Sequence, residues 1–199
     1  MEPTVALETN LKPGQTPLDA DESAGLKPKH ISTQGELDEW EAENLLSATR
    51  WLNGQKKLDV LNEKFCRNLH KRMFGDTWIW AGTFRKTEKN IGCDPIQIAI
   101  QLNQLLGNVT YWIEKETFEP DEIAARFHRE LVWIHPFPNG NGRHARCMAD
   151  ALLKQCGHPE FSWGSKNLVS ASEVRGRYIQ SLRDADAGNY ALLTEFVRS

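Results

Sequence analysis

Apolar side chains recur along most of this chain at the spacing of one face of an α-helix, every three to four residues. Strict alternation of apolar and polar residues, which is typical of half-buried strands, is rare. The pattern therefore predicts an all-α protein. The helices that it predicts lie at about 16–22, 37–53, 57–74, 95–112, 120–134, 147–154, 170–183 and 190–198.

The signals at the ends of these stretches support the same division. Thr33 and Glu36 fit a capping box before the helix at 37–53, although Ser32 is an alternative cap, and Gly54 closes that helix. Pro17 suits the first turn of the short helix at 16–22.

One segment departs from helical spacing. Residues 78–85 are rich in aromatic side chains and suit an extended conformation, and the polar residues 86–92 follow them. With Gly82 and Gly92 as its limits, this pair predicts one short β-hairpin. An unpaired hairpin edge can bind the backbone of another chain, and a plain exposed hairpin is the alternative.

The same pattern gives the domain organisation. Residues 1–15 show no periodicity and are expected to form a flexible arm. Residues 16–56 would form N-terminal helices, and residues 57–199 would form the core. No internal repeat and no second domain are predicted.

Composition narrows the function classes. The chain has 199 residues, of which 40% are hydrophobic and 26% charged, and the net charge is −3, so nothing favours direct nucleic-acid binding. No apolar run is long enough to cross a membrane, and no secretory signal is evident, so we expect a cytoplasmic protein. Four cysteines without a C-x-x-C pair are expected to be free thiols.

The densest chemistry lies between two predicted helices, at residues 135–146, which read HPFPNGNGRHAR. Gly140 and Gly142 let the backbone approach a ligand closely. The free N–H groups at the start of the following helix favour an anion, and Arg143 and Arg146 lie on one helical face. Together with His135, which can accept a proton near neutral pH, the loop predicts a phosphate site with a base beside it.

This loop resembles the signature of the Fic family, H-P-F-x-(D/E/N)-G-N-G-R-x-x-R, and matches every fixed position. The resemblance extends over residues 15–198, including the runs Trp80–Arg85 and Tyr178–Gly188. It implies a compact helical core with a short hairpin flap. The activity that it implies is transfer of AMP from ATP to a hydroxyl of a target protein.

The resemblance also implies roles for the loop residues. His135 would remove the proton from the target hydroxyl, and Arg143 and Arg146 would hold the β- and γ-phosphates. Asn141 and the N–H groups from Gly140 through Gly142 to Arg143 would cradle phosphate oxygens. Asn139 stands where many relatives carry an acid that binds Mg²⁺, and its neutral oxygen would bind the ion weakly. His144 occupies a variable position and is expected at the surface.

Further assignments rest on the same resemblance. The flap would dock the target through Thr87, Glu88, Lys89, Asn90 and Ile91. Tyr178 is either part of the core or a contact of the adenine.

Autoinhibition is a further expectation. Many relatives carry the motif (S/T)-x-x-x-E-(G/N), whose glutamate pairs with the second arginine of the loop. Glu43–Asn44 matches the end of this motif, although position 39 is Glu. Glu43 would therefore inhibit in cis by pairing with Arg146. The alternative is that Glu43 is one of several solvated acids, beside Glu39 and Glu41.

The residues at 16–19 and the helix after them also resemble a small bacterial sub-group called mobile mystery protein B, often encoded beside a helix-turn-helix partner. This resemblance implies an antitoxin-like partner of that kind. The alternatives to AMP transfer are a nucleotide-binding module, a toxin-like interaction protein without transfer activity, and transfer of another phosphate-containing group. The sequence leaves the target and the oligomeric state open.

Overall fold

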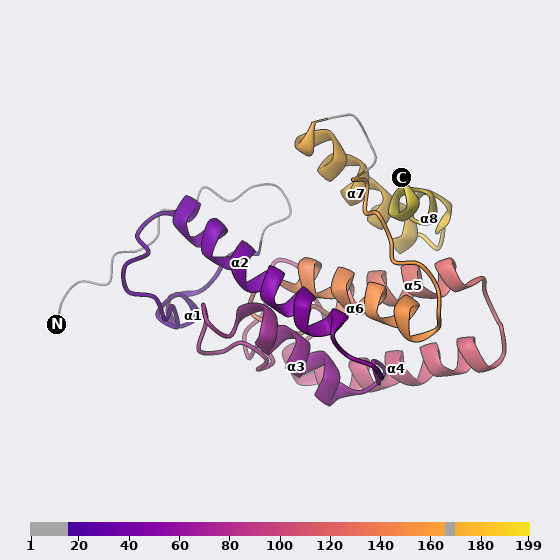
Figure 1. Cartoon of the computed structure of the whole chain (residues 1–199), viewed down its shortest axis with the longest axis horizontal. Helices are drawn as coiled ribbons and strands as arrows, with labels where there is room; N and C mark the ends of the chain where they lie inside the picture. The colour runs from indigo at the N-terminus through magenta and orange to yellow at the C-terminus, as the bar shows by residue number, and fades with distance from the viewer. Residues whose placement is uncertain (1–15, 166–169) are drawn as a thin grey trace.

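The computed structural model describes residues 16–165 and 170–199, and over these ranges it contains helices and no β-strand (Figure 1). The predicted flexible arm, residues 1–15, lies outside the described residues. In chain order the elements are α1 (Ala20–Ser23), α2 (Gln34–Asn53), α3 (Glu63–Phe74), a 3₁₀ turn (Pro95–Gln97), α4 (Ile98–Glu114), α5 (Pro120–Ile134), α6 (Asn141–Gln155), α7 (Ala171–Asp186) and α8 (Ala191–Arg198).

Helix ends follow the capping chemistry of the sequence. Thr33 and Glu36 form the predicted capping box of α2, and Gly54 is its C-cap. Helix α3 begins later than predicted, because the side chain of Asn62 accepts the N–H of Phe65 and places the first turn there.

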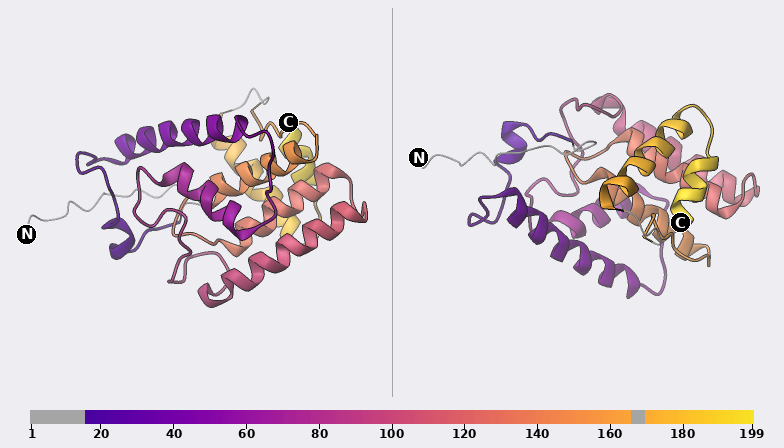
Figure 2. Two further views of the ribbon diagram at one scale, coloured as in Figure 1. Left: turned by 60° about the horizontal axis from the view of Figure 1, so that its bottom comes forward. Right: turned by 90° about the horizontal axis from the view of Figure 1, so that it is seen from above.

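The centre of the molecule is the antiparallel pair α5 and α6, joined by the loop 135–140. Helix α4 packs on α5, and α3 packs on α2 and α6. The large side chains of this core are fully buried, among them Phe127, Leu131 and Ile134 of α5 and Met148 of α6. A second cluster joins α7 and α8 to the other face of α5 and α6, at the end of the molecule away from α1 (Figures 1 and 2).

The all-α architecture is confirmed, but the segment 78–92 forms turns in place of the predicted hairpin. The reason lies in Arg85, whose buried guanidinium donates to the carbonyl oxygens of Thr87, Cys93 and His135. These side-chain hydrogen bonds fold the segment back on itself and take the place of a strand ladder. The one β-bridge in this segment joins Trp78 to Leu26, a residue far away in the chain.

Among the described helices, none combines the length and the apolar character that crossing a bilayer requires.

Candidate active site

The loop between α5 and α6 depends on two residues with left-handed backbone. His135 is the C-cap of α5, with φ 53° and ψ 58°, and Gly140 is the N-cap of α6, with φ 76°. A Cβ atom on Gly140 would lie 2.5 Å from the ring of Phe74, so only glycine fits at this approach. The two positions reverse the chain and bring the end of α5 to the start of α6.

A buried asparagine holds the loop in this shape. Asn141 accepts the N–H of Phe137 through Oδ1 (2.9 Å) and donates to the carbonyl oxygen of Phe137 through Nδ2 (2.7 Å). Phe137 itself is fully buried and stacks on His70, with ring centroids 3.7 Å apart. The side chain of Asn141 therefore stabilises the loop, and only its backbone N–H remains for the predicted phosphate contact.

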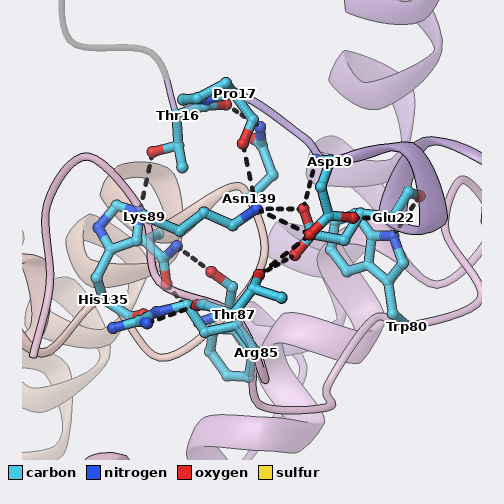
Figure 3. Close-up of polar contacts among 12 residues, drawn as sticks. Thr16, Pro17, Asp19, Glu22, Trp80, Arg85, Thr87, Lys89, His135 and Asn139 are labelled. Atoms are coloured by element: carbon cyan, nitrogen blue, oxygen red, sulfur yellow. Dashed lines mark hydrogen bonds and ion pairs between the residues drawn. The ribbon is translucent and has the colours of Figure 1, made fainter. Parts of the chain in front are cut away.

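The imidazole of His135 is buried, and both nitrogens have partners. Nδ1 lies 3.3 Å from the carbonyl oxygen of Val132, and Nε2 lies 2.9 Å from Oγ1 of Thr16 (Figure 3). Because a carbonyl oxygen only accepts, Nδ1 carries the proton and Nε2 accepts the hydroxyl hydrogen of Thr16. Burial lowers the pKa of His135 to about 4, so the ring is neutral at pH 7. This is the tautomer that a general base needs.

The start of α6 offers an anion site. The first helical hydrogen bond runs from His144 N–H to Gly140 O (2.9 Å), so the N–H groups of the three residues between them lie before the helical ladder. Arg143 and Arg146 extend from the same turn but have different partners. Arg143 pairs with Glu41, whereas Arg146 lies over the ring of Tyr178, 5.4 Å from its centroid.

The carboxylate that reaches the loop is Glu41 and not Glu43. Nη1 of Arg143 lies 2.7 Å from Oε2 of Glu41, and Nε1 of Trp78 donates to the other carboxylate oxygen (2.7 Å). Glu43 is exposed, because two residues of helix rotate a side chain through more than half a turn. Among the described residues, the expected ion pair of Glu43 with Arg146 is not formed, and the ion pair at this place joins Glu41 to Arg143.

The predicted docking segment contacts the chain's own N-terminal residues. Lys89 pairs with Glu22, and Thr87 donates to Asp19 at 3.1 Å (Figure 3). These contacts use side chains and not a strand edge. The other three residues of the segment, Glu88, Asn90 and Ile91, are exposed.

Asn139 connects the loop to the N-terminal residues. Its Nδ2 donates to the carbonyl oxygen of Thr16 (3.1 Å), and its Oδ1 accepts the N–H of Gly140 (2.6 Å). Over residues 16–165 and 170–199 no group of three or more histidine, cysteine or acidic side chains could hold a metal ion. The amide oxygen of Asn139 is neutral and already accepts one hydrogen bond, so by itself it fits poorly the oxygen-rich site that Mg²⁺ prefers.

Two histidines support the site and were not recognised from the sequence. His70 receives the N–H of Gly82 at Nδ1 (3.0 Å), so its Nε2 donates to the carbonyl oxygen of Asn139 (3.0 Å). His144, expected at the surface, is buried and donates to the carbonyl oxygen of Cys66 (2.9 Å). A lone histidine gives no periodic signal, so only the packing identifies these roles.

Tyr178 is partly buried against the second cluster, and its hydroxyl lies 2.9 Å from Nε2 of His128. These contacts favour the core role that the sequence left open. A contact with adenine stays a prediction.

Comparison with known proteins gives a consistent assignment. Residues 60–153 match the Fic/DOC family. The protein adenylyltransferase fic-1 of Caenorhabditis elegans is 30% identical over 204 residues, which cover 98% of this chain and 37% of the relative. The protein adenylyltransferase Fic of Aedes aegypti is 27% identical over 157 residues, covering 76% of this chain and 30% of the relative. The chain thus spans about a third of the length of these curated relatives.

Solved structures share the fold. A structure of Fic-1 (residues 134–508) from C. elegans has a TM-score of 0.60 at 26% identity, covering 79% of this chain and 46% of that chain. A crystal structure of BepC, a VirB-translocated effector from Bartonella tribocorum with bound AMPPNP, has a TM-score of 0.70 at 18% identity, covering 90% and 97%. Sequence match, fold and the complete loop signature agree: residues 60–153 of this chain form a domain of the Fic/DOC family.

Proposed function

We propose that this chain transfers AMP from ATP to a serine, threonine or tyrosine hydroxyl of a target protein. One observation carries the proposal. Nε2 of the neutral, buried His135 already accepts a hydroxyl hydrogen, from Thr16 at 2.9 Å, within the loop that leads into the start of α6. A base that binds a hydroxyl in this way is equipped to activate an alcohol nucleophile.

The reaction follows from this arrangement. Nε2 of His135 takes the hydroxyl proton while the oxygen forms a bond to the α-phosphorus of ATP. The bond between that phosphorus and the oxygen that bridges to the β-phosphate breaks, and pyrophosphate leaves with the electron pair. The proton then passes from the imidazole to solvent. The carbonyl oxygen of Val132 holds the ring in the reactive tautomer throughout.

Binding of the triphosphate is assigned to the start of α6. The N–H groups of Asn141 and Gly142 point away from the helix with the positive end of its dipole, and Arg143 and Arg146 add two guanidinium groups. In the structure the carboxylate of Glu41 forms an ion pair with Arg143. A phosphate that binds Arg143 must therefore compete with this carboxylate. We therefore assign the predicted inhibition in cis to Glu41 in place of Glu43.

For Mg²⁺ the side chain of Asn139 offers one neutral oxygen, which also accepts the N–H of Gly140, so it would bind the ion weakly. No step of the proposed reaction runs through the ion.

The test compares His135→Ala with His158→Ala, a control at an exposed histidine. Transfer of label from ATP labelled at the α-phosphate should fall by about 10²–10⁴-fold in His135→Ala, because the base is lost. The control should retain full transfer. ATP affinity, measured by calorimetry, should be the same in both variants, because His135 is not assigned to the triphosphate.

Two outcomes would favour the alternatives. ATP binding without transfer, in both the wild type and Glu41→Gln, would make the chain a nucleotide-binding module. Transfer of a different phosphate-containing group from another nucleotide would retain the role of His135 and change the substrate. A cytoplasmic location and an antitoxin-like helix-turn-helix partner stay predictions.

A further inference from the structure

Residues 16–22, which we call the strap, lie across the loop and the segment 86–92 and place a hydroxyl at the proposed base (Figure 3). The side chain of Thr16 is buried, and its Oγ1 is 2.9 Å from Nε2 of His135. Its carbonyl oxygen accepts a hydrogen bond from Nδ2 of Asn139 (3.1 Å). The loop therefore binds both the side chain and the backbone of this one residue.

The rest of the strap is bound by the segment expected to dock target proteins. The ammonium group of Lys89 donates to the carbonyl oxygen of Pro17 (3.3 Å), pairs with Glu22 and lies 3.7 Å from Asp19. Thr87 donates to Asp19 as well. The side chain of Lys89 is only 4% exposed and that of Glu22 11%, so their pairing is largely removed from water. Charges are desolvated in this way where they are paired and the geometry is defined.

The direction of the hydrogen bond between Thr16 and His135 is the one that a substrate hydroxyl would have. Because the carbonyl oxygen of Val132 fixes the proton of His135 on Nδ1, the hydroxyl of Thr16 is the donor and Nε2 the acceptor. A target hydroxyl makes this same contact in the proposed reaction. Thr16 thus has the place and the hydrogen-bond direction of a substrate.

We propose that Thr16 is itself an acceptor, so that the chain adenylylates its own strap. This inference rests on the proposed transfer of AMP. The hydroxyl of Thr16 loses its proton to His135, its oxygen bonds to the α-phosphorus of ATP, and pyrophosphate leaves as the bond to the bridging oxygen breaks. The product is an AMP ester on Thr16. Since that hydroxyl no longer has a proton to donate, the contact with His135 is lost and the base becomes accessible to other hydroxyls.

The experiment uses the full chain in a Glu41→Gln background, which removes the charge that competes for Arg143. Purified protein is incubated with ATP labelled at the α-phosphate, alone and with a cell lysate, and the labelled residue is mapped by tandem mass spectrometry. The variants are Thr16→Val, Thr16→Ser and His135→Ala. The matched control is Thr49→Val, which removes an exposed hydroxyl that bonds only to its own helix at Leu45.

We expect AMP at position 16 in the parent, in Thr16→Ser and in Thr49→Val, and none there in Thr16→Val or His135→Ala. Self-labelling should be first order in protein, and its rate constant should not change on dilution, because the strap belongs to the same molecule. Thr16→Val should still label lysate proteins, which shows that its site is intact.

Two results would overturn the inference. Self-labelling of Thr16→Val as strong as that of the parent would place the acceptor elsewhere, and so would a parent that labels lysate proteins but not position 16. In either case the proposed transfer of AMP would stand. If neither the chain nor any lysate protein is labelled by any variant, the proposed function fails, and this inference fails with it.

Discussion

The two ends of the loop between α5 and α6 are both covered by residues from the N-terminal part of the chain, but with different chemistry. At the first end His135 contacts the hydroxyl of Thr16, a hydrogen bond between uncharged groups. At the second end Arg143 contacts the carboxylate of Glu41. In the proposed reaction the target hydroxyl would make the first contact, and a phosphate of ATP would make the second.

Because one contact is neutral and the other is an ion pair, we expect them to respond differently to salt and to competing anions. A hydrogen bond between neutral groups contributes about 0.5–1.5 kcal/mol and depends little on salt. The ion pair is stronger, because the carboxylate side chain is only 7% exposed and Trp78 holds its second oxygen. A guanidinium group that is 34% exposed can still be reached by a competing phosphate.

Both contacts require a loop of fixed shape, and Asn141→Ala should remove that shape. The N–H and the carbonyl group of Phe137 would lose their partners in a buried place, which should lower the free energy of unfolding by about 2–4 kcal/mol. Urea denaturation measures the loss. Asn139→Ala is the control. Asn139 makes one hydrogen bond within the loop, to Gly140, and one to Thr16 of the strap, so the loss of stability in this variant should be smaller. Equal losses in the two variants would contradict the role of Asn141.

The second end can be tested alone with Glu41→Gln and its matched control Glu43→Gln, two neutral replacements on the same helix. Glu41→Gln should strengthen ATP binding by about 1.5–3 kcal/mol, roughly tenfold or more, because the charge that competes with phosphate is removed. Calorimetry at fixed ionic strength gives the affinity. Glu43 is exposed, so its variant should bind ATP as the wild type does. A stronger effect of Glu43→Gln would restore the assignment made from the sequence.

The first end can be tested by a titration of His135 in the wild type and in Thr16→Ala. Burial holds the pKa of His135 at about 4, below the 6.5 of an exposed histidine. Removing the side chain of Thr16 admits water, so the pKa should rise towards 6.5 by up to about 1 unit. NMR of the imidazole protons follows the change, with Thr49→Ala as the control. An unchanged pKa would mean that Thr16 does not shield the ring.

The same shift fixes a dependence of stability on pH. The folded pKa of His135 is lowered, so the unfolded chain binds this proton first as the pH falls below 6.5. The stability that the neutral ring contributes is complete above pH 6.5 and is lost towards pH 4, at about 1.4 kcal/mol per pH unit.

Most of the helices and the chemistry of the loop could be predicted from the sequence, because their signals are local. Apolar spacing and caps such as Thr33 and Gly54 lie within the element that they define. His135, Gly140 and Arg143 are neighbours in the sequence, so the proposed base and the proposed phosphate site lie in one short segment. Side-chain periodicity cannot reveal the partner of a carboxylate across the fold. The sequence therefore singled out Glu43 on its motif, whereas Glu41 is the residue that pairs with Arg143.

The contacts that the sequence could not predict join residues far apart in the chain. Thr16 and His135 are separated by 119 positions, and no pattern marks a single threonine as a partner. Arg85 overrode the strand preference of its aromatic neighbours, because a buried guanidinium needs several acceptors and took them from the backbone.

The part of the chain that matches the family begins at residue 60, and both covering groups, Thr16 and Glu41, come before it. The loop and the residues that cover it therefore come from two different segments of the chain. Exchanging the first 59 residues between relatives would alter when the loop is accessible, and the reacting groups would remain as they are.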